Sequence, residues 1–383
     1  MTATRVELLA CRRVAPGLPG ARPLPCAGRV SPNLLLEALA RGAAGVAVVP
    51  CDRDRGDCRF ERGAERAAAV AARTRRLVAV AGLAPERVAC VVPDAVADFV
   101  DLVRRLGPTG IAPWTRPVPP GLDGALGLLA ALLADPAAKP AWQRRAPLGP
   151  GETCETLFLH GVAPLAAVLL AEALPDASSG DPVALLAAAG IEARELPDER
   201  GAGGPLRAAG ETDRFVDLAR RNAERFAATG ATRIVTACAG CARTLTEAYA
   251  AAGVRLHAPV VPLVRVLAEA GGRVSDRGAL RLPACDPEAA SAWETLLGPV
   301  RPAGRKSPLA DAGDWLGGRA ARPAFDEVLS RVARASAERI YADCLRCAWS
   351  LALAARPGSW SRGAPPRVVP LGAIEPGKME VPR

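Results

Sequence analysis

Cysteines in matched pairs are the residues of this chain whose spacing points most directly to chemistry. Residues 231–245 read ATRIVTACAGCARTL, a short apolar run that ends in Cys-x-x-Cys, and residues 337–351 repeat the arrangement as AERIYADCLRCAWSL, 106 positions further on. A repeated strand, thiol pair and helix start indicates two copies of one supersecondary unit. The thiols of these pairs belong to Cys238, Cys241, Cys344 and Cys347.

Several chemistries suit such pairs. One Cys-x-x-Cys at a helix start could be a redox-active dithiol of thioredoxin type, because backbone N–H groups and the helix dipole favour the thiolate. Two copies favour metal ligation instead, with Cys285, after a strand expected at 279–282, as a spare ligand. Zinc is less natural, because zinc ribbons hold their pairs about 15 to 20 residues apart. His160 could replace a cysteine, as in Rieske centres, although a histidine at a strand end is more often a hydrogen-bonded structural residue.

A second group of cysteines follows the strands expected in the first hundred residues. Apolar runs at 5–10, 22–25 and 45–49 each end beside a cysteine, and a charged loop, DRDRGD, leads on to one more. Ligands of parallel sheets lie beyond the carboxyl ends of the strands. The sequence therefore predicts a thiolate ligand set made of Cys11, Cys26, Cys51 and Cys58. Cys90, inside an expected strand at 88–92, fits a small buried hydrophobe, and Cys154 is expected to be structural.

The elements that would position these thiols alternate between strands and helices. Ser31 as N-cap and Pro32 in the first turn predict a helix that Gly42 ends. Further helices are expected at 64–80, 94–106, 214–229 and 323–335. In the third of these, Asp213 is the expected N-cap, and one face carries Phe215, Ala219, Asn222 and Phe226. The alternation predicts an α/β fold, with an N-terminal parallel-sheet domain followed by two tandem α/β units.

Composition shifts suggest the domain boundaries. We expect a first domain at 1–110, a Pro/Gly-rich linker with one short helix at 111–152, and the tandem units at 153–271 and 272–360. Residues 361–383 show no periodicity and are expected to form a mobile tail.

The overall composition limits the functional classes. The net charge is +9 over 383 residues, but only three of the 49 basic residues are lysine, a bias typical of a GC-rich genome. Aromatic residues make up 4% and are not interleaved with basic clusters, which argues against nucleic-acid binding. No apolar run has the length of a signal peptide or a membrane span. We therefore expect a cytoplasmic protein whose 11 cysteines are reduced, and whose positive charge can steer docking to an acidic partner.

The first hundred residues resemble the delta (iron-sulfur) subunit of methyl-viologen-reducing hydrogenases. The resemblance covers about residues 5–105 and is carried by CAGRVSP at 26–32, GAAGVAVVPC at 42–51, GDCRFERG at 56–63 and GLAPERV at 82–88. It implies that Cys11, Cys26, Cys51 and Cys58 hold a [2Fe-2S] cluster, which needs four ligands. Two features depart from the family pattern. Val14 stands where the family usually has a second cysteine of a Cys-x-x-Cys, and the loop from Cys51 to Cys58 is two residues longer than usual. A zinc site or a vestigial site is the alternative.

Residues 155–356 resemble the tandem cysteine-rich (CCG) domain of heterodisulfide reductases. Each unit of that family has a lone cysteine, a Cys-Cys-Gly and a terminal Cys-x-x-Cys. Here His160 and Gly161 stand near the first lone position, and neither PDERGAGGPLRAAGE at 197–211 nor DAGDWLGG at 311–318 contains a cysteine. The family's disulfide-cleaving chemistry is therefore not implied. Two alternatives remain for this part of the chain. It could hold a second cluster, [4Fe-4S], through four thiolates, those of Cys238, Cys241, Cys344 and Cys347, with Cys285 as a spare ligand. It could instead be a decayed domain that is kept as a docking surface.

These observations predict an oxidoreductase component without substrate chemistry of its own. We expect an iron-sulfur electron-transfer subunit that assembles with hydrogenase or flavoprotein subunits as a hetero-oligomer and relays single electrons between them. No general acid, base or nucleophile stands out, and no Gly-rich phosphate loop supports nucleotide binding. The alternative is a non-redox assembly or scaffold subunit whose cysteines are vestigial or bind zinc.

Overall fold

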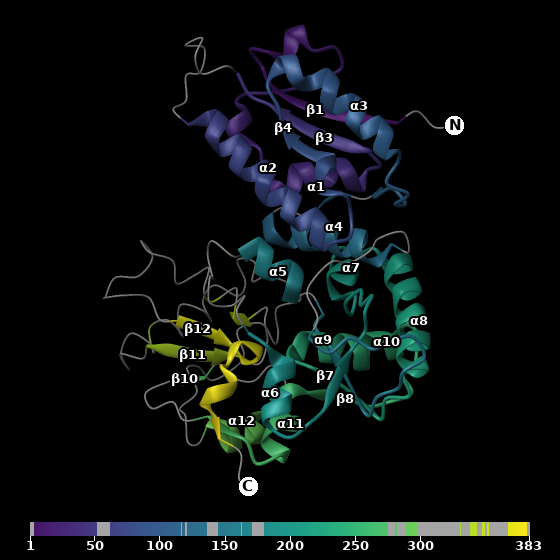
Figure 1. The fold of residues 1–383 in the computed structure, drawn as a ribbon, viewed down its shortest axis with the longest axis vertical. Helices are drawn as coiled ribbons and strands as arrows, with labels where there is room; N and C mark the ends of the chain where they lie inside the picture. Colours follow the sequence, from purple (N-terminus) through teal and green to yellow (C-terminus); the bar gives the residue numbers. More distant parts are fainter. Residues whose placement is uncertain are drawn as a thin grey trace. The chain divides into compact units, whose positions relative to one another are not determined.

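The computed structural model describes residues 4–51, 62–115, 117–118, 121–135, 145–161, 163–170, 180–274, 280–281, 289–297, 330, 338–342, 347–348, 351 and 367–380. The chain divides into two compact units, Met1–Trp142 and Gln143–Arg383. Both units are α/β with parallel sheets, which confirms the predicted fold class (Figure 1).

The N-terminal unit is built on a four-stranded parallel sheet in the order β2-β1-β3-β4. The strands are β1 (Val6–Cys11), β2 (Arg22–Leu24), β3 (Gly45–Val49) and β4 (Val88–Cys90). The helices are α1 (Pro32–Ala40), α2 (Gly63–Val80), α3 (Val96–Leu106) and α4 (Gly121–Ala134). Helix α3 covers one face of the sheet, where Phe99 and Val103 pack on Ala47, and α1 and α2 lie on the other (Figure 1).

Local signals in the sequence account for these elements. Ser31 caps α1 by accepting a hydrogen bond from the Leu34 N–H at 3.4 Å, and Pro32 occupies the first helical position, as predicted. Every residue of β3 is buried, which is the pattern of a central strand in a covered parallel sheet.

The connector expected at 111–152 contributes a packed helix. Helix α4 contacts α1, and its side chains from Ala125 to Ala134 are buried. A helix that is apolar on every side is stable in water only when other elements cover it. Helix α4 is therefore part of the core and not part of an exposed linker.

The second unit begins with another four-stranded parallel sheet, in the order β6-β5-β7-β8. Its strands are β5 (Thr156–Leu159), β6 (Ala193–Glu195), β7 (Arg233–Thr236) and β8 (Val260–Pro262). Its helices are α5 (Ala163–Leu170), α6 (Pro182–Ala188), α7 (Gly204–Ala208), α8 (Thr212–Ala228), α9 (Ala239–Arg243), a π-helical turn at Thr244–Ala248, α10 (Tyr249–Ala251) and α11 (Leu263–Glu269).

Helix α8 starts two residues before the predicted position. The Phe215 N–H donates to the Glu211 carbonyl at 2.9 Å, so the helical hydrogen bonds already begin there. Asp213, the predicted N-cap, therefore lies inside the first turn, where its carboxylate still faces the positive end of the helix dipole.

A third sheet, β10-β11-β12, repeats the pairing of the second. It consists of β10 (Leu280–Arg281), β11 (Arg339–Ala342) and β12 (Arg367–Pro370), and α12 (Ala289–Leu297) follows β10. Ile234 pairs with Val260 in one sheet, and Ile340 pairs with Val368 in the other. The tetrapeptide VVPL stands at 260–263 and again at 368–371, so the internal repeat extends past the cysteine pairs.

The predicted mobile tail is wrong for residues 367–380. β12 pairs in parallel with β11, and β13 (Met379–Glu380) pairs antiparallel with β9 (Arg273–Val274). Leu371, Ile374 and Met379 lie in the same hydrophobic cluster as Trp293 of α12. Burial of these side chains stabilises the segment. Its strands are too short to show a periodic pattern in the sequence.

The helix predicted at 323–335 lies outside the described residues, apart from residue 330. Where the structure describes the chain, none of its helices is both long and apolar enough to cross a membrane.

Candidate metal centre

Three cysteines of the predicted N-terminal set lie at the same edge of the first sheet. Cys11 is the last residue of β1, Cys26 lies two residues beyond β2, and Cys51 lies two residues beyond β3. These strands are neighbours, with β1 between β2 and β3, and adjacent strands run about 5 Å apart. All three side chains are buried, at 4–5% exposure. The fold therefore places three shielded thiols at the ends of neighbouring strands, although within the described residues they do not come together as a metal-binding group.

A close contact between two glycines fixes the loop that carries Cys26. A Cβ added to Gly28 would lie 2.7 Å from the carbonyl oxygen and 2.8 Å from the Cα of Gly63, the first residue of α2. Only glycine permits this approach of two backbones. The segment before α2 contains Cys58, which lies outside the described residues. The contact thus ties the loop of Cys26 to the end of the segment that supplies the fourth predicted ligand.

Val14 and Cys90 have different surroundings from the three cysteines at the strand ends. Val14, where the resembling family has a cysteine, packs on the apolar cluster formed by Ala10, Val49 and Val96. Cys90 is the last residue of the edge strand β4, where it pairs in register with Val48 and is partly buried, and burial raises the pKa of its thiol. A raised pKa keeps a thiol protonated and unreactive, which agrees with the absence of a predicted role.

The second unit places its first cysteine pair between β7 and α9. Cys238 is the residue preceding α9, and Cys241 lies in its first turn. Both side chains are 3% exposed. A Cβ built on Gly161 would lie 2.5 Å from the Cys241 Sγ, and Gly161 has a left-handed backbone with φ of +67°. A cysteine at 161, which lies near the lone-cysteine position of the resembling family, would therefore require Cys241 to move.

A buried acid-histidine network adjoins this thiol pair. His160 Nε2 is hydrogen bonded to Glu195 Oε1, and the other oxygen of Glu195 accepts the N–H groups of Arg145 and Ala146 at 2.7 and 2.6 Å. Glu199 accepts the N–H groups of His160 and Gly161 at 3.0 and 2.7 Å. Burial alone would raise the pKa of Glu195, but the hydrogen bond from His160, the two backbone donors and the attraction of His160 together lower it. His160 thus makes the hydrogen bond expected of a structural histidine, and metal ligation through its other ring nitrogen stays a prediction.

A second buried polar contact holds α10, which follows the segment that carries Cys241. Asn222 Nδ2 donates to the Gly201 carbonyl at 2.8 Å and to the Tyr249 hydroxyl at 2.9 Å. Burial raises the pKa of Tyr249, and the nearby Cys241 raises it further, whereas the Asn222 hydrogen bond opposes the shift. Asn222 occupies the apolar face of α8, as predicted. That lone polar residue among apolar ones was the sequence signal for this contact, whereas Glu195 and Glu199 gave none.

The other C-terminal candidates are only partly described. Cys347 is buried at 1% exposure, beyond β11, whereas Cys285 and Cys344 lie outside the described residues. Within the described ranges, no three His, Cys, Asp or Glu side chains come together as a metal-binding group. The ligand sets predicted for both halves of the chain each include at least one residue that the structure does not describe, so they stay predictions.

The fold and these residues define a class of α/β protein in which buried thiols collect at the carboxyl ends of parallel strands. Residues 20–107 match the family "Methyl-viologen-reducing hydrogenase, delta subunit", and residues 180–246 match the family "Cysteine-rich domain" (CCG). An iron-sulfur subunit of the F420-non-reducing hydrogenase of Archaeoglobus profundus is 33% identical over 94 residues, which cover 22% of this chain and 67% of that relative. The chain therefore belongs to the hydrogenase delta-subunit family through its N-terminal unit, and it carries a cysteine-rich domain after it.

Proposed function

We propose that this chain is an iron-sulfur electron-transfer subunit of a hydrogenase or heterodisulfide reductase type of redox complex. The observation that carries the proposal is the burial of Cys11, Cys26 and Cys51 at one sheet edge, next to and within the segment that matches the delta-subunit family. The matching relative is by name a hydrogenase iron-sulfur subunit. Together these support a redox role more strongly than a scaffold role, because buried thiols at strand ends suit ligation better than docking.

The N-terminal thiols fit a [2Fe-2S] cluster in number and kind when Cys58 is the fourth ligand. Thiolate-only donor sets suit iron-sulfur clusters. A bound cluster would accept and donate single electrons. The chain would hold it through these four residues and shield it from water by the burial of the edge, and both burial and nearby backbone donors tune the reduction potential.

The C-terminal cysteines extend the proposal to a second cluster, [4Fe-4S]. Cys238, Cys241 and Cys347 are buried, and with Cys344 they would supply four thiolates, Cys285 being the spare. The Cys-Cys-Gly segments are missing from both units, so the proposed role is relay and not disulfide cleavage. We further propose that the subunit works in the cytoplasm, in a hetero-oligomer with hydrogenase or flavoprotein subunits.

Replacing Cys26 by Ser tests the N-terminal assignment. We expect the variant to lose the electron paramagnetic resonance signal of a reduced [2Fe-2S] cluster while its circular dichroism stays native, because one thiolate ligand is removed from an intact fold. Iron and sulfide are measured after anaerobic purification. About two iron atoms per chain correspond to the N-terminal cluster alone and about six to both clusters.

Cys90→Ser is the matched control, since Cys90, at the end of β4, has a thiol whose pKa is raised by burial and is assigned no ligand role. We expect it to keep the full signal. If the wild-type chain, reduced and prepared anaerobically, shows no cluster signal and less than about one iron atom, the scaffold alternative is correct. A Cys26→Ser variant with an unchanged signal would remove the N-terminal assignment only.

A further inference from the structure

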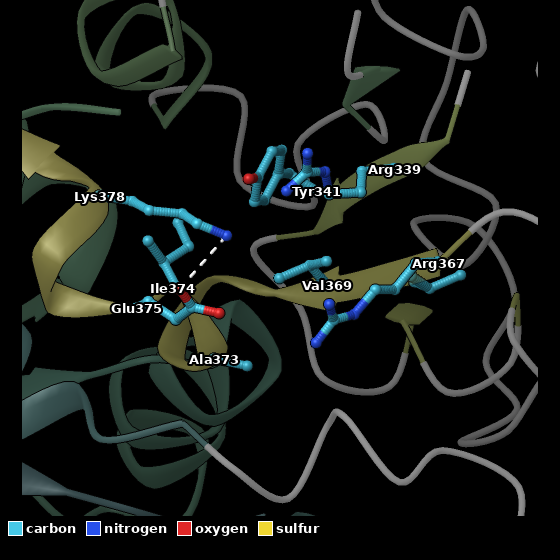
Figure 2. A pocket seen from close by; sticks show the side chains of 9 residues that line it. Arg339, Tyr341, Arg367, Val369, Ala373, Ile374, Glu375 and Lys378 are labelled. Atoms are coloured by element: carbon cyan, nitrogen blue, oxygen red, sulfur yellow. Dashed lines mark ion pairs between the residues drawn. The ribbon is translucent and has the colours of Figure 1, made fainter. Parts of the chain in front are cut away.

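Enclosed polar groups of the second unit lie in two places. One is a small pocket that is lined by residues of β11 and β12 and by Lys378 (Figure 2). Its water-accessible volume is about 20 Å³, and one water molecule requires roughly 10–15 Å³ by the same measure, so the pocket has room for one or two water molecules only. The other place adjoins Cys238 and Cys241, where the hydroxyl groups of Thr236 and Tyr249 are buried.

Thr236, the last residue of β7, has a hydroxyl group without a hydrogen-bond partner. Its side chain is fully buried, and its Oγ1 makes no hydrogen bond to any described residue. Val235 belongs to the hydrophobic cluster around Leu263, and Ala237 packs against that cluster. Because side chains alternate along an extended chain, Thr236 and Cys238 lie together on the opposite side. The unpartnered hydroxyl is thus on the same side of the strand as the first thiol of the pair.

The π-helical turn places a second hydroxyl group in line with Cys241. Residues 239–251 form one continuous helix, made of α9, the π-helical turn and α10. Tyr249 stands at position i+8 from Cys241, and in a regular α-helix that spacing is about 80° past two full turns. A π-helical turn takes up one extra residue. The rotation then becomes that of seven α-helical residues, about 20° short of two turns, so Cys241 and Tyr249 share one face of the helix.

The Tyr249 side chain has a direction and a hydrogen-bond pattern that suit donation toward Cys241. Long side chains on a helix point toward its N-terminus, which is the direction of Cys241. Burial raises the pKa of Tyr249 and Cys241 raises it further, which requires the two side chains to be close. The Tyr249 oxygen accepts a hydrogen bond from Asn222 Nδ2 at 2.9 Å. No described residue accepts its hydroxyl proton.

The two hydroxyl groups are thus buried donors beside a pair of cysteines. Buried donors without an acceptor are rare in proteins, because each leaves a desolvated polar group unpaired. A protonated thiol is only a weak acceptor. An ionised thiolate accepts hydrogen bonds much more strongly, and metal ligation requires the thiolate. The two donors therefore match the ligating form of the cysteine pair.

We propose that the hydroxyl groups of Thr236 and Tyr249 donate hydrogen bonds to the sulfur atoms of Cys238 and Cys241 when these bind the second cluster. The inference rests on the proposed function, since it requires that cluster. Hydrogen bonds to the sulfurs stabilise the more negatively charged, reduced state, so both hydroxyl groups raise the reduction potential. Asn222 is a positioning residue here, because its hydrogen bond occupies the Tyr249 oxygen and orients the hydroxyl group.

A redox titration of the full chain, followed by electron paramagnetic resonance, tests the proposal. The signal of the second cluster is the one that persists in Cys26→Ser. We expect Tyr249→Phe and Thr236→Val each to make reduction about fivefold less favourable, a shift of about 40 mV to more negative potential for one electron. The iron content should stay at about six atoms. Thr236→Ser keeps the hydroxyl group and should keep the wild-type potential. Either variant decides the matter if the other does not fold or retain its iron.

Thr246→Val is the matched control, because Thr246 is exposed on the same helix and its hydroxyl group already donates to the Ala242 carbonyl at 3.0 Å. We expect it to leave the potential unchanged. Unchanged potentials in Tyr249→Phe and Thr236→Val, with the iron content intact, would overturn the inference and leave the proposed function standing. An equal shift in Thr246→Val would overturn it too, as a general effect of substitution. A wild-type chain with only about two iron atoms would show that the second cluster is absent, and would overturn that part of the proposed function together with this inference.

Discussion

At the scale of single residues, the most consequential side chain outside the thiols is Glu195. It is completely buried, yet it accepts hydrogen bonds from His160 and from two backbone N–H groups that precede β5. A buried carboxylate is tolerated only when its charge and its lone pairs are matched in this way. Glu195 thereby joins the end of β6 to the end of β5, beside the loop that packs on Cys241.

Glu195→Gln should lower the free energy of unfolding by about 2 kcal/mol at neutral pH, because a charge-assisted hydrogen bond is replaced by a neutral one. The folded state lowers the pKa of Glu195 from its ordinary value of 4.5. The stabilisation is therefore present above pH 4.5 and is lost as the pH falls through the lower, folded value. Urea unfolding of wild type and variant across this range checks the prediction. The two curves should converge in acid.

Glu192→Gln serves as the control for this substitution. Glu192 lies three positions away with 87% of its side chain exposed, so its loss should change stability by less than about 0.5 kcal/mol. A constant difference between Glu195→Gln and wild type at every pH would show that the carboxylate charge contributes nothing.

At the scale of elements, the contact between Gly28 and Gly63 determines how the loop of Cys26 meets α2. Gly28→Ala places a methyl group 2.7 Å from a backbone oxygen that cannot rotate away. We expect a loss of about 1–3 kcal/mol from this overpacking, together with reduced iron incorporation, because the loop must move from α2. Thermal unfolding and iron content after anaerobic reconstitution are the measurements.

Gly17→Ala is the matched control, since a Cβ at Gly17 meets no atom within 4 Å and the residue has no left-handed backbone. It should leave both measurements unchanged. Native stability and iron content in Gly28→Ala would show that the two backbones separate at no cost, and the contact would then have no part in the metal centre.

The elements that were predicted correctly are specified by residues within them or next to them in sequence, whereas the missed features depend on partners that are distant in sequence. Ser31 and Pro32 define the start of α1 without any long-range information. By contrast, β12 has four residues in a Pro/Gly-rich stretch, and only its pairing with β11 makes it a strand. The partners of Glu195 and Glu199 lie 35 to 50 positions away in sequence. No pattern within one element specifies such contacts, so the sequence predicts the strand-end positions of the thiols but not their polar surroundings.

At the scale of the whole molecule, the repeat in the second unit includes its C-terminal segment. VVPL at 260–263 forms β8 and leads into α11, and VVPL at 368–371 forms β12 and leads into a buried turn. Leu263 and Leu371, the last residues of the two copies, are both buried in one apolar cluster. The C-terminal segment is thus the closing strand of the second copy and not an appendage.

Leu371→Ala tests whether that closing strand stabilises the second unit alone. Leu371 is 1% exposed, so its truncation should cost about 2–5 kcal/mol through lost burial and the remaining cavity. Because the N-terminal unit has apolar clusters of its own, the visible absorbance of its proposed iron-sulfur cluster should persist at temperatures where circular dichroism shows the second unit unfolding.

Val92→Ala is the control, because 59% of the side chain is exposed. It should change the free energy of unfolding by less than about 0.5 kcal/mol. If Leu371→Ala loses no more stability than Val92→Ala, the prediction of a mobile C-terminal tail would be supported after all. Simultaneous loss of the cluster absorbance would show that the two units unfold as one.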